Sequence, residues 1–206
     1  MTVTGEMEVR KLSRRDAEEA SQIIGEVMGW WHGYYAKAAL ETLERSAALL
    51  AVLNGKPVGT AVGYIAEGEG PVIGVVYYIA VREGYRRRGV GSLLLAGLER
   101  ELKALGAEIL LATIEEGNNA SISLFKRRSF MVKSVEEFEE EIGWEPLEAL
   151  LHAACSYEEE LIAIKEVRGD VKLSCLKVGA YRETWWKACY LPWVRLRYSR
   201  RRGKWR

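Results

Sequence analysis

The sequence predicts an α/β (α+β) fold, in which a mixed but mostly antiparallel sheet carries helices on both faces and a basic C-terminal extension follows. Asn54-Gly55 joins two β-prone runs, which is the strongest short-range signal for a hairpin. From residue 72 onward, β-prone and helical segments alternate, as in a sheet covered by helices. Residues 1–167 carry 18 bases and 27 acids (net −9), whereas residues 168–206 carry 12 bases and 2 acids (net +10).

Each element is expected from apolar periodicity and end signals. Apolar residues alternate with polar ones over 7–12, as in a strand. Ser13-x-x-Asp16 then has the form of a capping box that opens a helix to about Gly29. Gly106 supplies the C-cap of a strongly periodic helix. The other expected helices and strands are a helix at 30–49, strands at 49–53, 58–65 and 72–81, a helix at 90–105, a strand at 108–114, a helix at 118–128 and a strand at 130–135.

Beyond Val135 the signals weaken. Residues 146–155 have a helical pattern, and 161–167 and 171–178 have the pattern of two strands around Arg168-Gly169-Asp170. A chain of 206 residues suits one domain with a modest extension. We therefore expect a domain over 1–167, with its core at 6–135, and a basic, Trp-rich extension over 168–206.

Composition restricts the class of protein. Hydrophobic residues make up 49% of the chain and charged residues 29%, enough apolar material for a core without a disulfide framework. Cys155, Cys175 and Cys189 are too few and too widely spaced for such a framework, which favours a reducing cytoplasm. We find no signal peptide and no apolar run of membrane-spanning length. One Gln and three Asn among many Glu, Lys and Arg are typical of a thermophile.

The most informative segment runs from Arg86 to Ser92, between an expected strand and an expected helix. Gly89 and Gly91 carry no Cβ where the backbone must turn and approach a ligand. The free N–H groups and the positive dipole end of the helix make an anion site suited to a diphosphate, and the three arginines add charge. The alternative is a plain strand-to-helix turn with solvated arginines. Both the GxGxxG fingerprint and the GxxxxGK[ST] loop are absent.

A second motif accompanies this loop, and together they resemble the GNAT acetyltransferase superfamily over roughly residues 6–135. The segment 86–91, Arg-Arg-Arg-Gly-Val-Gly, matches the family's [R/Q]-x-x-G-x-[G/A] in full. The segment 118–130 matches N-x-x-A-x-x-L-[Y/F]-x-[K/R]-x-G-F, except that Ser121 and Ser129 replace the alanine and the glycine. The resemblance implies an acyltransferase that uses acetyl-CoA as co-substrate and needs no metal.

The resemblance also implies which residues bind coenzyme A. The backbone near Ile79 and Val81 would bind the pantetheine arm, and the amides of 87–92 would bind the diphosphate. For Leu124 and Phe130 we favour core packing. The cofactor-binding residues implied are Ile79, Ala80, Val81, Arg86, Arg87, Arg88, Gly89, Val90, Gly91, Ser92, Asn118, Ser121 and Phe125.

The expected catalytic pair is missing. Family members often supply a glutamate base and a tyrosine acid, but Val75 and Thr113 stand at two base positions and Phe125 stands at the acid position. Tyr77 is the candidate catalytic residue, because alternation gives it the parity of Val75, Ile79 and Val81; core packing is the favoured alternative. Weaker candidates are His32 and the strand-end acids Glu115 and Glu116, and positioning of the reactants alone is a further option.

Trp30, Trp31, His32 and Tyr34, followed by Tyr35, form an aromatic segment that either borders the acceptor or covers the core. The acidic body favours a cationic amine: a small molecule, a peptide N-terminus or a lysine. The alternatives are a ribosomal-protein N-terminal acetyltransferase, which the missing Glu and Tyr pair disfavours, and a non-catalytic protein that binds acyl-CoA or nucleic acid.

The C-terminal segment places Trp185, Trp186, Trp193 and Trp205 among basic residues, as in proteins that bind single-stranded nucleic acid. We favour instead that the first three tryptophans pack on the acidic body or on a second subunit of a homodimer, leaving 199–206 solvated. Exposed tryptophans favour aggregation.

Overall fold

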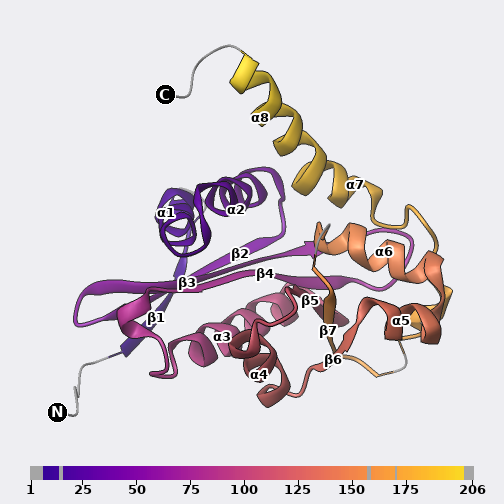
Figure 1. Ribbon diagram of the computed structural model, residues 1–206, viewed down its shortest axis with the longest axis horizontal. Helices are drawn as coiled ribbons and strands as arrows, with labels where there is room; N and C mark the ends of the chain where they lie inside the picture. The colour runs from indigo at the N-terminus through magenta and orange to yellow at the C-terminus, as the bar shows by residue number, and fades with distance from the viewer. Residues whose placement is uncertain (1–6, 14–15, 157–158, 170, 202–206) are drawn as a thin grey trace.

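The computed structural model describes residues 7–13, 16–156, 159–169 and 171–201, and its centre is a seven-stranded sheet (Figure 1). The strand order is β1-β2-β3-β4-β5-β7-β6, and β4 and β5 are the one parallel pair in this sheet. The predicted mixed, mostly antiparallel sheet is therefore confirmed. The strands are β1 (Met7–Leu12), β2 (Ser46–Leu53), β3 (Lys56–Ala66), β4 (Ile73–Val81), β5 (Ile109–Ile114), β6 (Met131–Ser134) and β7 (Leu161–Glu166).

Helices cover both faces of the sheet. On one face lie α1 (Ala17–Met28), α2 (Trp30–Thr42) and α6 (Trp144–Ala154), and on the other lie α3 (Val90–Ala104) and α4 (Asn119–Arg127) (Figure 1). Strand β3 shows why two separate cores form. Val62 and Tyr64 pack on the α1, α2 and α6 side, whereas Ala61 and Ile65 pack on the α3 side, because side chains alternate along a strand.

Two predictions about the N-terminal third are wrong. The second helix ends at Thr42, and residues 46–49 belong to strand β2. Both faces of β2 are buried, so its run of apolar residues has no two-residue period to distinguish it from a helix. Ser13 does not cap α1; its N–H and hydroxyl donate to the carboxylate of Asp16, and the N-cap Asp16 makes no side-chain capping bond.

The segment after β6 also differs from expectation. Helix α5 (Val135–Ile142) follows β6 directly and opens with a complete capping box between Ser134 and Glu137. The Ser-x-x-Glu pattern at 134–137 marks this helix start in the sequence, although no helix was expected there. The strand expected at 171–178 is wrong; the described part holds a 3₁₀ turn, η3 (Leu173–Cys175). Both edges of β7 are occupied by β5 and β6, so a hairpin partner has no free edge to join. Asp170 lies outside the described residues.

The C-terminal segment is one helical run that crosses from α6 to α2. It comprises α7 (Arg182–Trp185), a π-helical turn η4 (Trp186–Tyr190) and α8 (Leu191–Arg201). Pro192 explains the widened turn, because it has no N–H to donate and its ring would clash in a regular α-helix. Tyr181 and Ala188 lie in the same core as α6. The division into a domain over 1–167 and an extension over 168–206 stays a prediction.

Cys155 and Cys189, which the sequence analysis did not pair, form a disulfide with their Cα atoms 5.7 Å apart. Packing of η4 against the end of α6 brings together residues 34 positions apart in the sequence. Cys175 is a free and exposed cysteine. The tertiary contact of the C-terminal segment therefore decides the pairing, and spacing along the chain gives no sign of it.

Candidate functional site

The site is centred where β4 and β5 separate. These parallel strands pair only over Ile73–Val75 and Ile109–Leu111, although β4 continues to Val81. Beyond Val75, β4 keeps its partner β3 on one side, while its other side faces no strand of the described sheet. Backbone N–H and C=O groups on such an edge require partners. An extended ligand with amide groups can supply them.

The glycine loop lies at the end of β4. A 3₁₀ turn, η2 (Glu83–Tyr85), leads into it, and Arg87 and Gly89 both adopt left-handed backbone angles, with φ of +60° and +82°. Glycine accepts this conformation without strain, whereas it is uncommon for arginine. Gly89 is the N-cap of α3 and no side chain caps this helix. The first N–H groups of α3 are therefore available to an anion.

The three arginines of the loop are exposed, as a phosphate-binding role requires. Arg86 is oriented by a hydrogen bond from its Nε to the carbonyl of Val81, at 3.1 Å. Arg88 lies over the ring of Tyr85, with its guanidinium carbon 5.8 Å from the ring centroid. The loop thus combines uncapped helix amides with three cations, an arrangement suited to a diphosphate.

The second motif packs beside this loop. Asn118 accepts a hydrogen bond from the amide of Ser121 at 3.1 Å and so caps α4. Phe125 is buried, with its ring 5.0 Å from that of Phe130, so it has a packing role in the described structure. The side chain of Leu124 faces Gly91: a Cβ built there would lie 3.6 Å from Leu124 Cδ2.

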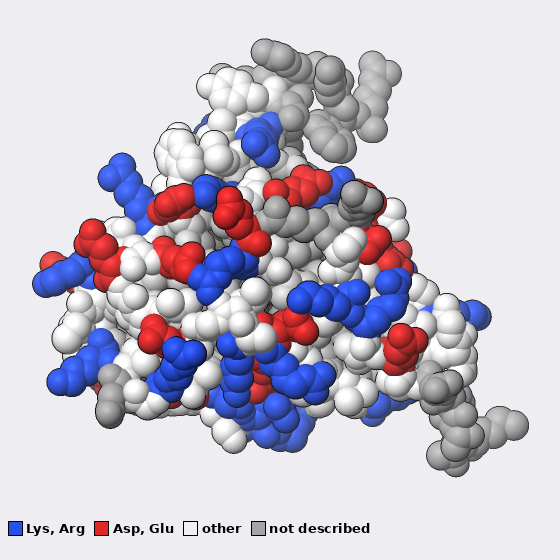
Figure 2. All heavy atoms as spheres, turned by 180° about the vertical axis from the view of Figure 1, so that it is seen from behind, with Lys and Arg blue, Asp and Glu red and all other residues white. Residues whose placement is uncertain are grey.

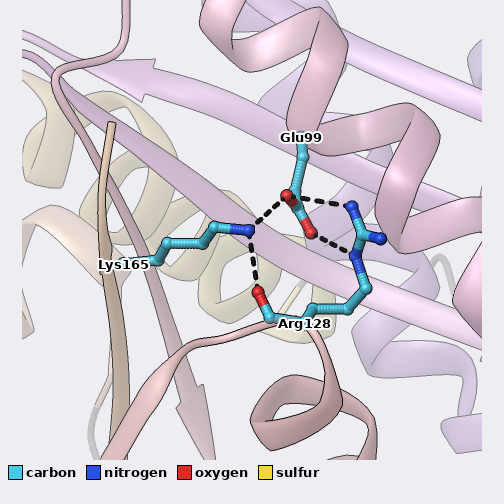
Figure 3. A network of polar contacts seen from close by, with 3 residues as sticks. All are labelled: Glu99, Arg128 and Lys165. Carbon is cyan, nitrogen blue, oxygen red and sulfur yellow. Dashed lines mark hydrogen bonds and ion pairs between the residues drawn. The ribbon is translucent and has the colours of Figure 1, made fainter. Parts of the chain in front are cut away.

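A buried ion network connects the elements that carry the two motifs (Figure 3). The carboxylate of Glu99, on α3, accepts hydrogen bonds from Arg128 Nε at 2.9 Å and from Lys165 Nζ at 2.8 Å. Lys165 also donates to the carbonyl of Arg128 at 2.7 Å. Burial by itself raises the pKa of Glu99, but these two cations outweigh it and the pKa is lowered. The charged carboxylate therefore holds α3, the end of α4 and β7 in one arrangement.

A β-bulge in β4 changes which side chains face the opening. Tyr78 pairs with Val62 and Val76 with Gly63, so Tyr77 is an extra residue in β4. Tyr77 packs with Val75 on the α1, α2 and α6 side and Tyr78 packs on the same side. Ile79 and Val81 pack on the α3 side. The parity assigned to Tyr77 from simple alternation is thus wrong with respect to Ile79 and Val81.

Tyr77 and Tyr78 belong to a tyrosine cluster, which we define as His32, Tyr35, Tyr64, Tyr77 and Tyr78. The ring of Tyr78 lies 4.2 Å from that of Tyr77 and 5.6 Å from that of His32. Burial raises the pKa of Tyr77 well above its ordinary value, and nearby tyrosines add to the rise. Burial likewise raises the pKa of Tyr78, and the carboxylate of Glu159 adds to it. Both phenols therefore stay protonated and can donate hydrogen bonds near neutral pH.

Two residues at this site were missed by the sequence analysis. Simple alternation from Tyr77 would place Tyr78 on the opposite face, because a bulge leaves no mark in the sequence. Glu159 lies two residues before β7, and its carboxylate accepts a hydrogen bond from Ser156 Oγ at 2.7 Å. No motif marks it.

The other predicted residues lie in several places. Tyr34 donates to the carbonyl of Pro192 at 3.0 Å, whereas Trp30 and Trp31 are exposed. The acids Glu115 and Glu116 are exposed at the end of β5. Thus α2 contributes His32 and Tyr35 to the tyrosine cluster, and the rings of Trp31 and Tyr34 contact Tyr35, with centroid distances of 5.2 Å and 5.7 Å.

Within the described ranges, no three His, Cys, Asp or Glu side chains gather closely enough to hold a metal ion. The helices of the same ranges include none with the length and apolar character needed to cross a membrane.

The chain is similar to known acetyltransferases. The pattern of the acetyltransferase (GNAT) family matches residues 9–130. An acetyltransferase of Yersinia pestis (strain Pestoides F) is 33% identical over 82 residues, which cover 40% of this chain and 55% of the relative. The chain thus spans about half the length of the curated relatives that it matches. These Yersinia relatives do not support the thermophilic origin that the composition suggests.

Solved structures share the fold at low identity. The ribosomal-protein-S18-alanine N-acetyltransferase from Escherichia coli has a TM-score of 0.56 at 19% identity, and the match covers 81% of this chain and 97% of that one. An aminoglycoside N-acetyltransferase in complex with CoA has a TM-score of 0.52 at 18% identity, and that match covers 62% and 89%.

Proposed function

Since this chain belongs to the acetyltransferase (GNAT) family, we propose that it transfers an acetyl group from acetyl-CoA to a primary amine. One observation carries this proposal: the opening between β4 and β5 ends at the uncapped, glycine-led start of α3. An open strand edge suits the amides of a pantetheine arm, and the helix start suits a diphosphate. Coenzyme A contains both groups, joined in that order.

Coenzyme A would be bound mainly by the backbone. The open edge of β4, with Ile79, Ala80 and Val81, would pair with the pantetheine amides. The amides of 87–92 and the cations of Arg86 to Arg88 would bind the diphosphate. The start of α4, with Asn118 and Ser121, would border the other side, and Phe125 would support it from the core.

The transfer requires one bond to form and one to break. The amine nitrogen attacks the thioester carbonyl carbon, the C–N bond forms, and the C–S bond breaks. The amine loses a proton and the departing thiolate gains one. Tyr78 and Tyr77 are protonated phenols on the α1, α2 and α6 side of β4, and we assign the donation of that proton to them. We assign the acceptance of the amine's proton to His32, which lies edge-on to Tyr78, or to Glu159, whose carboxylate adds to the rise in the pKa of Tyr78.

The chemical class of the acceptor is inferred from the charge of this chain and from the proteins whose solved structures share its fold. Glu159 beside the cluster and the excess of acids over residues 1–167 favour a cationic amine. The two solved neighbours act, by their names, on an aminoglycoside and on the alanine of ribosomal protein S18. A small polyamine-like molecule, a peptide N-terminus and a lysine therefore form the test panel.

A second candidate function is acyl-CoA binding without catalysis. It is favoured by Val75, Thr113 and Phe125, which stand where many family members carry acid or base side chains. Acetyl-CoA affinity is measured first by titration calorimetry, and thiol release is then measured against the panel. Binding with release supports the transferase, and binding without release on any amine supports the second candidate. A dissociation constant weaker than the millimolar range contradicts both.

A further inference from the structure

A hollow of about 250 Å³ lies between the start of α2 and α8. We call it the aromatic hollow; its lining residues are Trp30, Trp31, Trp193, Leu196 and Arg197. Its tryptophans are unusually exposed, at 57% for Trp30, 44% for Trp31 and 40% for Trp193. Three indoles from two elements gathered around one concave surface mark an interaction site rather than a covering of the core.

A row of aromatic rings continues along the C-terminal helical run, with Trp186 and Trp193 exposed and Tyr190 half-buried. Trp186, Tyr190 and Trp193 follow one another at helical spacing, with ring centroids 4.5 Å and 6.0 Å apart. Arg197 extends the row, and its guanidinium carbon lies 4.7 Å from the ring centroid of Trp193. The row ends in the aromatic hollow. Trp185, in contrast, is partly buried against His152, so the expected packing on the body is confirmed for Trp185. Trp186 and Trp193 remain exposed on this chain, and their packing on a second subunit stays a prediction.

The same run is strongly basic. Residues 182–206 contain nine Lys or Arg and one acid, Glu183, which pairs with Lys187 at 2.6 Å. The part of α8 that the structure describes projects from the body, and Figure 2 shows basic and uncharged side chains on this projection. Trp205 and the last three bases, Arg202, Lys204 and Arg206, lie outside the described residues. The body beneath carries the excess of acids, so the two parts have opposite charge.

We propose that the aromatic hollow and the row of rings leading to it bind single-stranded nucleic acid, with bases stacked on the indoles and phosphates paired with the cations of α8. Flat rings in a basic setting are what such binding requires, because every base has a face to stack and every nucleotide has a phosphate. The residues of this site are not among those assigned to acetyl-CoA, and the proposal does not depend on the proposed transferase activity.

Two other partners fit less well. An apolar protein surface would bury Arg197 without a counter-charge, and burial of an unpaired cation is costly. A lipid bilayer is entered by a convex apolar face, whereas the tryptophans here line a concave surface from two sides. A nucleobase fits a hollow of this kind, and its phosphates give Arg197 a partner.

The rest of the fold holds the two sides of the hollow in place before any ligand binds. Tyr34 donates a hydrogen bond to the carbonyl of Pro192, which connects α2 to the first turn of α8. The disulfide between Cys155 and Cys189 fixes the preceding turn to α6. Preorganisation of this kind lowers the entropic cost of binding.

The test uses the full chain and a fluorescein-labelled oligouridine of about twelve nucleotides, within the range that single-strand binding folds cover. Polarisation should show saturable binding. Trp193→Ala should weaken it about 5- to 150-fold, as expected for the loss of one to three kcal/mol of stacking. Trp144→Ala is the matched control, because that indole is 54% exposed but lies outside the hollow. It should leave the affinity unchanged.

Salt dependence tests the phosphate contacts. With four phosphates paired, binding should weaken roughly 50-fold between about 50 and 200 mM salt. Arg197→Gln should reduce this dependence, whereas Arg100→Gln, an exposed arginine on α3, should not. The proposal is overturned if binding is absent at the lower salt, or if Trp193→Ala and Trp144→Ala weaken it equally. It is also overturned if the chain does not bind the oligonucleotide and instead either binds anionic vesicles or dimerises through Trp193. Acetyl-CoA affinity, measured on the same variants, should not change.

Discussion

The imidazole of His32 lies edge-on to the phenol of Tyr78, with ring centroids 5.6 Å apart and an interplanar angle of 78°. This contact joins α2 to β4 at the place where β4 leaves its parallel partner β5. It exists because the bulge at Tyr77 turns Tyr78 toward α2. A group that can accept a proton and a phenol that can donate one therefore meet beside the proposed acetyl site.

Loss of either member of this pair should reduce turnover without loss of cofactor binding. For His32→Gln and Tyr78→Phe we expect kcat to fall about 10²- to 10⁴-fold, the usual contribution of proton transfer. Thiol release at saturating acetyl-CoA measures it, with the best amine of the panel. Tyr34→Phe is the control, since its hydroxyl contacts Pro192 instead. If Tyr77→Phe alone lowers kcat, the proton donor is Tyr77 and the assignment to Tyr78 is wrong.

A side chain at Gly91 should weaken coenzyme A binding while the protein stays folded. A Cβ there would meet Leu124 Cδ2 at 3.6 Å and Val81 Cγ2 at 3.9 Å, which are ordinary contacts. Any loss of coenzyme A affinity in Gly91→Val would therefore come mainly from contact between the new side chain and the ligand, and not from contacts within the protein. We expect at least a tenfold loss of affinity by calorimetry with little change in Tm. Gly169→Ala, which meets no atom within 4 Å, should change neither quantity.

Replacement of Ser129 by glycine should stabilise the protein. Ser129 has a φ of +62°, in the left-handed region that costs a residue with a Cβ about 1–2 kcal/mol. Glycine removes that cost but loses about 0.5–1 kcal/mol of chain entropy, so the net gain should be about 1 kcal/mol or less. Denaturant unfolding measures it. Ser123→Gly, at an exposed position within α4, should instead destabilise by about 0.5 kcal/mol. Equal effects at both positions would contradict this account.

Reduction of the disulfide should destabilise the chain. A closed loop of 34 residues predicts a loss of about 4 kcal/mol from the chain entropy of the unfolded state. Cys189→Ser should show a similar loss in unfolding experiments, and added reductant should not lower its stability further. Cys175→Ser should leave stability unchanged, because Cys175 is exposed and unbridged. A wild-type Tm that does not respond to reductant would show that the bridge contributes nothing in solution.

The network around Glu99 should make stability depend on acid pH. The pKa of Glu99 in the folded state is below its ordinary value of 4.5, so its contribution is present above about pH 4.5 and is lost as pH falls through the folded value. Glu99→Gln should cost about 1.5–3 kcal/mol at neutral pH, the usual range for hydrogen bonds to a charged group.

The control for this prediction lies on the same helix. Glu101 forms a surface ion pair with Lys11, so Glu101→Gln should cost less than about 1 kcal/mol. Urea unfolding at several pH values compares the two variants. Below pH 4.5 the free energy of unfolding should fall faster with decreasing pH for the wild type than for Glu99→Gln. Equal slopes would contradict the lowered pKa of Glu99.

Several features could be predicted from the sequence because they depend on local patterns. The Asn54-Gly55 turn, the uncapped start of α3 after Gly89 and the start of α4 at Asn118 each occupy a few consecutive residues. Errors arose where local patterns are ambiguous. Strand β2 is apolar on both faces and resembles a helix, and simple alternation along β4 fails at the bulge.

What the sequence determines by itself is thus the family, the glycine loop and the elements that flank it, because backbone conformation and helix-end chemistry depend on neighbouring residues. The tertiary structure alone decides that His32 meets Tyr78, that Cys155 meets Cys189 and that the tryptophans of α2 and α8 face one hollow. Each of these joins residues at least 34 positions apart. Such contacts arise from how helices pack on the sheet, and they leave no periodic mark along the chain.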